Sequence, residues 1–165
     1  SVLDIVPTSH VFKNTNAILA KRYYHWFFLI QSYPLPETMI GNDPEYYIRS
    51  KLQMWGANNE YLTEEIIQEY LRCFTTETIQ ASCEDYRAGA SIDLVHHEED
   101  FDKKISCPLQ VLWGSKATLE ELYDPIKVWK EWALNVEGQS IDCGHFLPEE
   151  SPVETYNAII NFFKK

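Results

Sequence analysis

The sequence contains no long apolar run and few basic residues. Its most apolar stretch, Trp26–Ile30, is far shorter than the roughly 20 residues that a membrane-spanning helix needs. Fourteen lysines and arginines stand against 25 aspartates and glutamates, which gives a formal net charge of −11. A surface this acidic repels phosphate groups and anionic lipids. These shortages argue against a transmembrane span and against nucleic acid or a membrane surface as a partner.

Cysteine is also scarce, and its spacing matches no metal-binding motif. The four cysteines are separated by 10, 24 and 36 residues, so no pair has the CxxC spacing, and no histidine lies at zinc-finger distance. Because 45% of the residues are apolar, the chain needs no disulfide framework to build its core. We therefore expect no metal, no cofactor, and reduced, mostly buried thiols in a cytoplasmic protein.

The chain is apolar from its first residues. Its 165 residues suffice for one ordinary domain, but Ser1–Pro7 contains neither an initiator methionine nor a basic, signal-like segment. The β-branched run within it is typical of a core strand. We expect this chain to be a fragment that lacks the N-terminal core segment of a larger protein.

Hydrophobic periodicity divides the rest of the chain into two regions with different secondary-structure patterns. From about Val11 to Asp93 the pattern predicts only helices, because apolar residues recur at helical spacing between prolines and capping residues. The expected helices cover Asn14–Gln31, a segment capped by Asp43, a segment capped by Thr63, and Glu77–Asp93.

After about His96, strands and helices alternate. This order is typical of an open parallel sheet with flanking helices. The expected elements are a strand at Leu109–Trp113, a helix at Pro125–Leu134, a strand at Glu137–Asp142 and a helix at Pro152–Lys165. The sequence therefore predicts an α/β fold with an inserted helical cap, divided into a strand end at 1–8, the cap at 9–95 and the sheet region at 96–165.

Two residues that suit catalysis follow expected strands. In parallel sheets, ligands bind beyond the carboxyl ends of the strands. Asp4 lies near the end of the first strand, and His145 follows the last one, directly after Gly144. Imidazole titrates near neutral pH and suits a general base. We expect Asp4 and His145 to meet at one edge of the sheet, although Asp4 taken alone is better explained as a turn-forming residue before proline.

Five sequence blocks make the chain similar to a known family. In order along the chain they resemble the haloacetate (fluoroacetate) dehalogenases of the α/β-hydrolase superfamily, specifically the cap and the last core strands of those enzymes. The blocks are Leu3–Pro7, Tyr24–Leu29, Glu84–Gly89, Leu112–Gly114 and Gly144–Glu150.

The resemblance implies roles for five residues. His145 matches the histidine that activates water, and Asp4 matches the acid behind it. His25, Trp26 and Tyr86 match the halide-binding trio, whose N–H and O–H groups can stabilise a departing anion. Plain packing in the cap is the alternative explanation for these three side chains.

The resemblance also implies a part that this sequence does not contain. In the family, a nucleophilic aspartate and the arginines that hold the substrate carboxylate belong upstream of Ser1. The implied reaction is hydrolysis of a 2-haloacid through an aspartyl ester, with water as co-substrate. We therefore expect the 165-residue chain alone to be inactive, and the complete enzyme to be a homodimer.

Two other functions stay open. Epoxide hydrolases of the same architecture use two cap tyrosines; Tyr86 could be one, but His25 and Trp26 stand where the other is expected. A non-catalytic binding or assembly protein would explain the missing nucleophile. However, the segment Val2–Val6 carries only one charge, which is too little to protect an exposed sheet edge.

Overall fold

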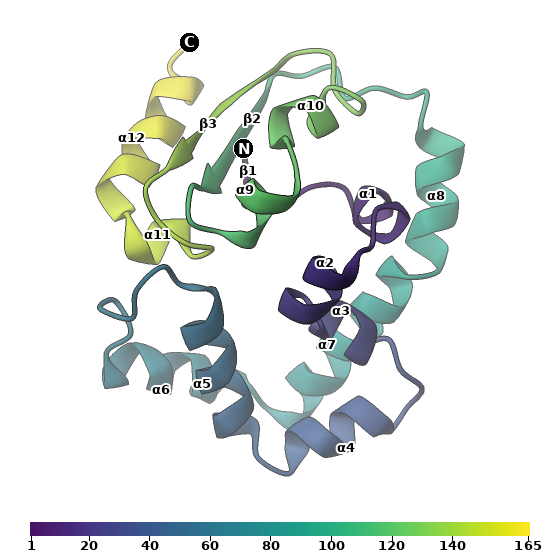
Figure 1. Ribbon diagram of the computed structural model, residues 1–165, viewed down its shortest axis with the longest axis vertical. Helices are drawn as coiled ribbons and strands as arrows, with labels where there is room; N and C mark the ends of the chain where they lie inside the picture. The colour runs from purple at the N-terminus through teal and green to yellow at the C-terminus, as the bar shows by residue number, and fades with distance from the viewer.

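The computed structural model describes residues Ser1–Lys165 and combines a three-stranded sheet with twelve helices (Figure 1). None of these helices has the length and apolar character that crossing a bilayer requires. The strands are β1 (Val2–Leu3), β2 (Leu109–Gly114) and β3 (Val136–Ile141). The helices are α1 (Thr8–Lys13), α2 (Ala17–Arg22), α3 (His25–Phe28), α4 (Leu35–Gly41), α5 (Pro44–Trp55), α6 (Glu64–Cys73), α7 (Thr76–Gly89), α8 (Ile92–Asp100), α9 (Thr118–Leu122), α10 (Pro125–Trp129), α11 (Leu147–Glu150) and α12 (Pro152–Phe163).

The sheet is parallel and has the order β1-β2-β3. Val111 in the central strand β2 pairs with Val2 on one side and with Gly138 on the other. Because all three strands run in the same direction, the segments that follow them meet at one edge. This register brings the residues after Leu3, Gly114 and Ile141 together.

Alternating side chains of β2 pack against helices on opposite faces. On one face, Leu112 packs with Ile159 of α12, and the Gln110 side chain donates a hydrogen bond to a carbonyl of that helix. On the other face, Val111 packs with Ile126 of α10. Both faces of β2 are therefore covered, as is typical of a parallel strand, and the expected α/β fold is confirmed.

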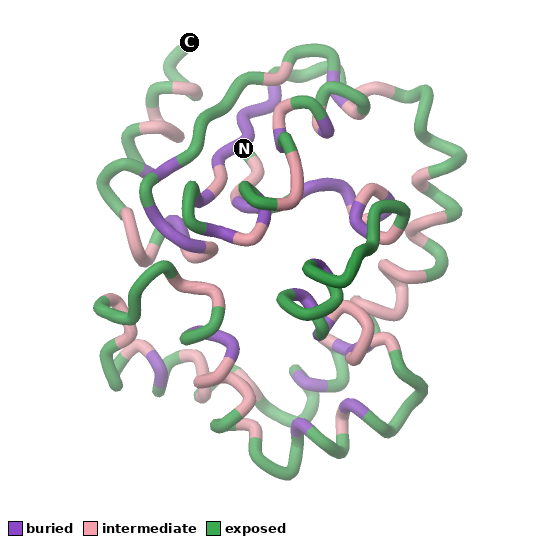
Figure 2. The backbone as a smooth tube through the Cα atoms, in the orientation of Figure 1, coloured by how far each residue is buried: buried purple, intermediate pink, exposed green.

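Helices α1–α8 are inserted between β1 and β2 and arch away from the sheet (Figure 1). The cap has a small core of its own, formed by Leu29, Ile40, Ile79 and Cys83. Figure 2 shows a long buried stretch along β2 and buried residues in the loop after β3, whereas most of the cap is intermediate or exposed with short buried segments.

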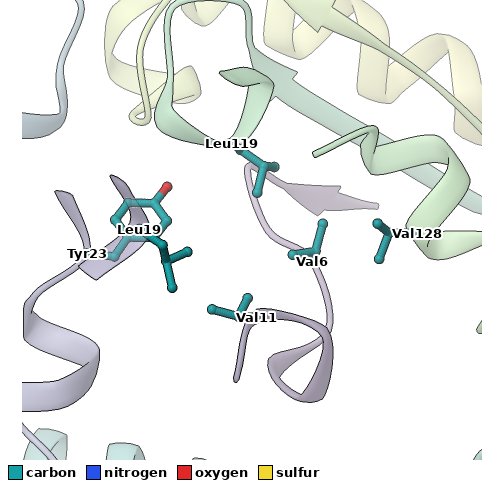
Figure 3. Packing of buried hydrophobic residues seen from close by; sticks show 6 residues of the cluster. All are labelled: Val6, Val11, Leu19, Tyr23, Leu119 and Val128. Atoms are coloured by element: carbon teal, nitrogen blue, oxygen red, sulfur yellow. The ribbon is translucent and has the colours of Figure 1, made fainter. Parts of the chain in front are cut away.

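A second apolar cluster joins the cap to the sheet region (Figure 3). Leu19 of α2 and Tyr23, which follows that helix, pack against Leu119 of α9. Val6, which follows β1, lies against Val128 of α10. We call this group, completed by Val11, the bridging cluster. It fixes the cap relative to the carboxyl edge of the sheet.

The Asp43 and Thr63 caps are confirmed, but the predicted helix Asn14–Gln31 is wrong in its continuity. It is divided into α2 and α3 at Tyr23 and Tyr24. The Tyr23 side chain packs in the bridging cluster, so tertiary packing overrides the local helix preference. The division places His25 at the start of α3.

The predicted helix Glu77–Asp93 also ends early. Helix α7 stops at Gly89, where the hydroxyl of Ser91 donates a hydrogen bond to the Arg87 carbonyl and satisfies a free helix end. Helix α8 then runs from Ile92 to Asp100, so the expected domain boundary after residue 95 falls within a helix. The boundary after residue 8 falls at the first turn of α1.

Other boundaries differ where loops pair with the sheet. Helix α10 ends at Trp129 rather than at Leu134, because the segment that follows forms a bridge between Ala133 and Ile105. The first strand covers only Val2–Leu3. The short helices α4, α9 and α11 were not expected. All four cysteines are free, but only two are buried, so the expectation of mostly buried thiols is wrong.

Candidate active site

Asp4 lies at the end of β1 in a backbone conformation that few residues adopt. Its φ is 47°, in the left-handed region, which aspartate tolerates better than most residues. The backbone N–H donates to the Leu112 carbonyl at 2.8 Å, and Oδ1 accepts a hydrogen bond from the Gly114 N–H at 3.1 Å. The residue is only 4% exposed. Asp4 is therefore held firmly against the end of β2.

His145 follows β3 and reaches the same point. Its Nδ1 lies 2.6 Å from Oδ2 of Asp4, and its backbone N–H donates to the Trp55 carbonyl at 3.0 Å. Because a carboxylate only accepts, this contact places the proton on Nδ1 and leaves Nε2 free to take one. The side chain is 34% exposed, so solvent can reach the ring. The sequence correctly predicts that these two residues meet at the carboxyl edge.

Two glycines allow the strand ends to approach one another. A Cβ atom on Gly114 would collide with the backbone of Cys143 and Gly144. A Cβ on Gly144 would lie 2.7 Å from the Trp55 carbonyl oxygen. Both positions therefore require glycine, because the backbone segments at the two strand ends lie in contact. This contact determines where the His145 loop lies relative to β2.

Asp4 and His145 line a cavity of about 270 Å³ between the sheet edge and the cap. His25, Trp26 and Tyr86 line it from the cap side. The Tyr86 ring lies edge-on to both other rings, with centroid distances of 5.5 Å to His25 and 5.9 Å to Trp26. All five residues singled out from the sequence therefore surround one space. The remaining lining residues are Leu3, Ile5, Val6, Val11, Tyr23, Trp55 and Leu119.

Burial fixes the protonation of two cap side chains. It lowers the pKa of His25 to about 3, with further contributions from the nearby charges of Lys51 and His145. It also raises the pKa of Tyr86 to about 12, assisted by the charge of Asp85. Near neutral pH, His25 is therefore a neutral imidazole and Tyr86 a protonated phenol. Each can donate a hydrogen bond to an anion.

Trp55 is a site residue to which no sequence motif points. Its ring centroid lies 4.7 Å from that of His25 and 5.5 Å from that of His145, so it contacts both groups of site residues. Its position at the end of α5, directly before Gly56, is the one local signal that it could leave the helix face. The contact itself depends on how the cap is seated.

Tyr23 and Lys51 were also not expected near the site. Tyr23 lines the cavity, and burial together with the charge of Asp4 raises its pKa. Lys51 is 5% exposed, and its ammonium group lies 3.5 Å from the centroid of the Tyr24 ring without a carboxylate partner. Burial lowers the pKa of Lys51 to about 8. The cap therefore places the buried Lys51 side chain near His25.

No group of three or more histidine, cysteine, aspartate or glutamate side chains is arranged to hold a metal ion. The cavity is therefore lined by an acid–histidine pair and by three side chains that carry N–H or O–H groups.

Comparison with known proteins places this arrangement in a family. No family model matches the chain. The chain is 34% identical to a fluoroacetate dehalogenase from Burkholderia sp over 98% of its own length and 54% of that protein. It is 31% identical to a soluble epoxide hydrolase from Corynebacterium sp. (strain C12), over 76% of its own length and 44% of that relative.

A solved structure is similar to this chain over nearly its whole length. The crystal structure of a protein from Nostoc sp PCC 7120, assigned to the α/β hydrolases, superposes with a TM-score of 0.95 at 52% identity. The match covers 98% of this chain and 56% of that one. The chain thus spans about half the length of the relatives it matches. The chain belongs to the α/β-hydrolase superfamily.

Proposed function

We propose that this chain supplies the cap and the histidine of a hydrolase that cleaves the carbon–halogen bond of a haloacetate. The observation that carries the proposal is the cavity itself. It has an Asp4–His145 pair on one wall and three anion-compatible donors on the other, His25, Trp26 and Tyr86. The similarity to a fluoroacetate dehalogenase supports the same reaction. The nucleophile is an aspartate that lies outside this chain.

In the first step, that aspartate attacks the halogen-bearing carbon. A carbon–oxygen bond forms, the carbon–halogen bond breaks, and the halide leaves with the bonding electrons. Fluoride is a poor leaving group, so its developing charge must be stabilised by fixed donors. The neutral His25 imidazole, the Trp26 indole and the Tyr86 phenol are suited to this task.

In the second step, water attacks the ester carbonyl while His145 accepts its proton. Asp4 holds Nδ1–H, which orients the ring and stabilises the imidazolium that forms. The ester then breaks to release a hydroxyacid and the free aspartate. The apolar lining of the cavity limits the water that reaches the ester.

Hydrolysis of an epoxide is the second candidate. One specific observation favours it: two tyrosines, Tyr23 and Tyr86, line the cavity, and burial keeps both phenols protonated by raising their pKa. Such a pair could protonate an epoxide oxygen. The similarity to a soluble epoxide hydrolase points in the same direction.

The test uses the full-length protein that contains this chain, with His145→Ala and Tyr86→Phe variants. A carboxylate needs no base to act as a nucleophile, so His145→Ala should still displace halide. Water attack should slow by roughly 10²–10⁴-fold, as is typical when a general base is lost. This variant should release about one halide per site and accumulate an ester, visible as added mass on the nucleophile peptide.

Tyr86→Phe should behave in the opposite way. Halide departure slows, so no ester accumulates. Normal turnover by His145→Ala, or ester accumulation only in Tyr86→Phe, would contradict the assigned roles. Turnover of an epoxide but not of a haloacetate by the wild-type protein would favour the second candidate. The 165-residue chain alone should release no halide, because Asp4 is the only carboxylate that lines the cavity.

A further inference from the structure

One carboxylate binds the backbone on both sides of His145. The Glu150 side chain, at the end of α11, accepts hydrogen bonds from the N–H of Gly144 at 2.9 Å and from the N–H of Phe146 at 3.1 Å. Between them, the His145 N–H donates to the Trp55 carbonyl. Three successive backbone donors of the histidine loop are therefore fixed, two of them by Glu150.

The same carboxylate also binds the cap. Oε2 of Glu150, which accepts from Gly144, accepts a second bond at 2.8 Å from the N–H of Ala57. Ala57 lies two residues beyond Trp55, whose ring contacts both His25 and His145. One side chain thus connects the cap segment after α5 to the loop that carries the histidine.

Glu150 is not needed there as a charge partner. It makes no ion pair with any lysine, arginine or histidine, and its side chain is half-buried. Its bonding consists of three backbone N–H groups from two segments that are far apart in the sequence. Hydrogen bonds from N–H groups to a charged acceptor are stronger than those to a neutral one, so this arrangement holds the backbone more firmly than a neutral side chain would.

We propose that Glu150 is the positioning residue for His145: its carboxylate fixes the histidine loop against Trp55–Ala57 so that the imidazole faces both Asp4 and the cavity. This inference rests on the proposed function, because it assigns Glu150 to the step in which His145 acts. Misplacing a catalytic group by about 1 Å can reduce a rate by about 10²-fold. The loss of Glu150 should therefore slow ester hydrolysis and leave halide displacement almost unchanged.

Glu149 offers a matched control on the same short helix. Its carboxylate accepts a hydrogen bond from the Tyr70 hydroxyl at 2.7 Å and so also contacts the cap, but it makes no bond to the histidine loop. Glu150→Gln and Glu149→Gln remove the same charge from adjacent positions. Only Glu150→Gln replaces an acceptor oxygen that the loop uses with an amide donor.

The experiment compares both variants in the full-length protein, with fluoroacetate as substrate. Halide release gives kcat and kcat/KM, and intact-protein mass gives the fraction held as ester. For Glu150→Gln we expect kcat to fall about 10–100-fold, kcat/KM to change less than about threefold, and the ester to accumulate. Glu149→Gln should resemble the wild type in all three. An equal fall of kcat and kcat/KM in Glu150→Gln, or an unchanged ester fraction, would overturn the proposal.

A readout without turnover separates this inference from the proposed function. The Nδ1 proton of His145, held by Asp4, should give a low-field NMR resonance in the wild type and in Glu149→Gln. Glu150→Gln should broaden or lose it, because the ring no longer stays in place. If His145→Ala forms no ester but Glu150→Gln still loses this resonance, the proposed reaction fails and the positioning role stands. A resonance that persists unchanged in Glu150→Gln overturns the positioning role.

Discussion

His25 illustrates how burial decides the chemistry of a single residue. It is only 4% exposed, and Nδ1 has no partner within the protein. A buried polar atom without a partner is rare and calls for an explanation, and a ligand at this wall of the cavity would provide one. A histidine that is neutral throughout the working pH range donates a hydrogen bond without adding a second proton source beside His145.

The lowered pKa of His25 makes a prediction about stability. Between pH 6.5, the ordinary pKa of histidine, and about 3, the unfolded chain binds a proton that the folded chain does not. Stability is therefore lost as the pH falls below 6.5, with a contribution from this residue of about 1.4 kcal/mol per pH unit. His25→Gln should remove that contribution and give a shallower pH dependence in urea unfolding of the full-length protein.

The protonation state of His25 can also be followed directly. In the folded wild-type protein, the ring carbon and nitrogen shifts of His25 should stay those of a neutral imidazole down to pH 5. A titration with a midpoint near 6.5 would contradict the assignment. So would a His25→Gln variant whose free energy of unfolding depends on pH as steeply as that of the wild type.

Among the elements, those with local signals could be predicted from the sequence. Helices α5 and α6 begin where Asp43 and Thr63 cap them, and the side chains accept the expected backbone hydrogen bonds. Strand β2 has the short, continuous apolar pattern of a buried parallel strand. Its neighbour β3 is mostly exposed, yet the prediction differs from it by only one residue at each end.

Elements that depend on distant contacts could not be predicted. The break between α2 and α3 depends on where the Tyr23 ring packs, and the end of α10 depends on the bridge between Ala133 and Ile105. For the site, the pattern and the resemblance placed five residues correctly around one cavity. The contacts of Trp55 and Glu150 could not be predicted, because they involve backbone atoms and ring faces that have no sequence pattern.

The close approach of two loops at the sheet edge predicts the effect of a small substitution. Gly114→Ala adds a methyl group where the backbone of Cys143 and Gly144 already lies. We expect the free energy of unfolding to fall by about 1–3 kcal/mol, as for other overpacked sites, and the His145 loop to move away from Asp4. Chemical denaturation and a crystal structure of the variant would measure both effects.

Gly41 provides the control for that substitution. It ends helix α4, and a Cβ atom there would meet nothing within 4 Å. Gly41→Ala should be neutral or stabilising by up to about 1 kcal/mol, because alanine restricts the unfolded chain and favours the helix. If Gly114→Ala lowered the free energy of unfolding no more than Gly41→Ala, the close contact at Gly114 would not determine the position of the histidine loop.

At the scale of the whole molecule, the function we propose requires that the cap stay fixed on the sheet edge. The donors His25, Trp26 and Tyr86 belong to the cap, whereas Asp4 and His145 belong to the sheet region. The bridging cluster joins these two parts (Figure 3). The separate cluster around Ile79 lies within the cap alone. The two clusters should therefore differ in how far the effect of a substitution spreads.

Leu119→Ala and Ile79→Ala test this difference with similar losses of buried volume. Leu119 is 2% exposed and Ile79 is 4% exposed, so each substitution should lower the free energy of unfolding by about 2–5 kcal/mol. Because Leu119 packs in the bridging cluster, its loss should speed hydrogen exchange in both α2 and α9 and reduce turnover. Loss of Ile79 should speed exchange in the helices around its own cluster, α4 and α7, and leave α9 protected.

Hydrogen-exchange mass spectrometry of the full-length variants measures both patterns. If Leu119→Ala affected only α9, the bridging cluster would not couple the cap to the sheet. The backbone contacts of Trp55 and Ala57 would then have to hold the two walls of the cavity in place.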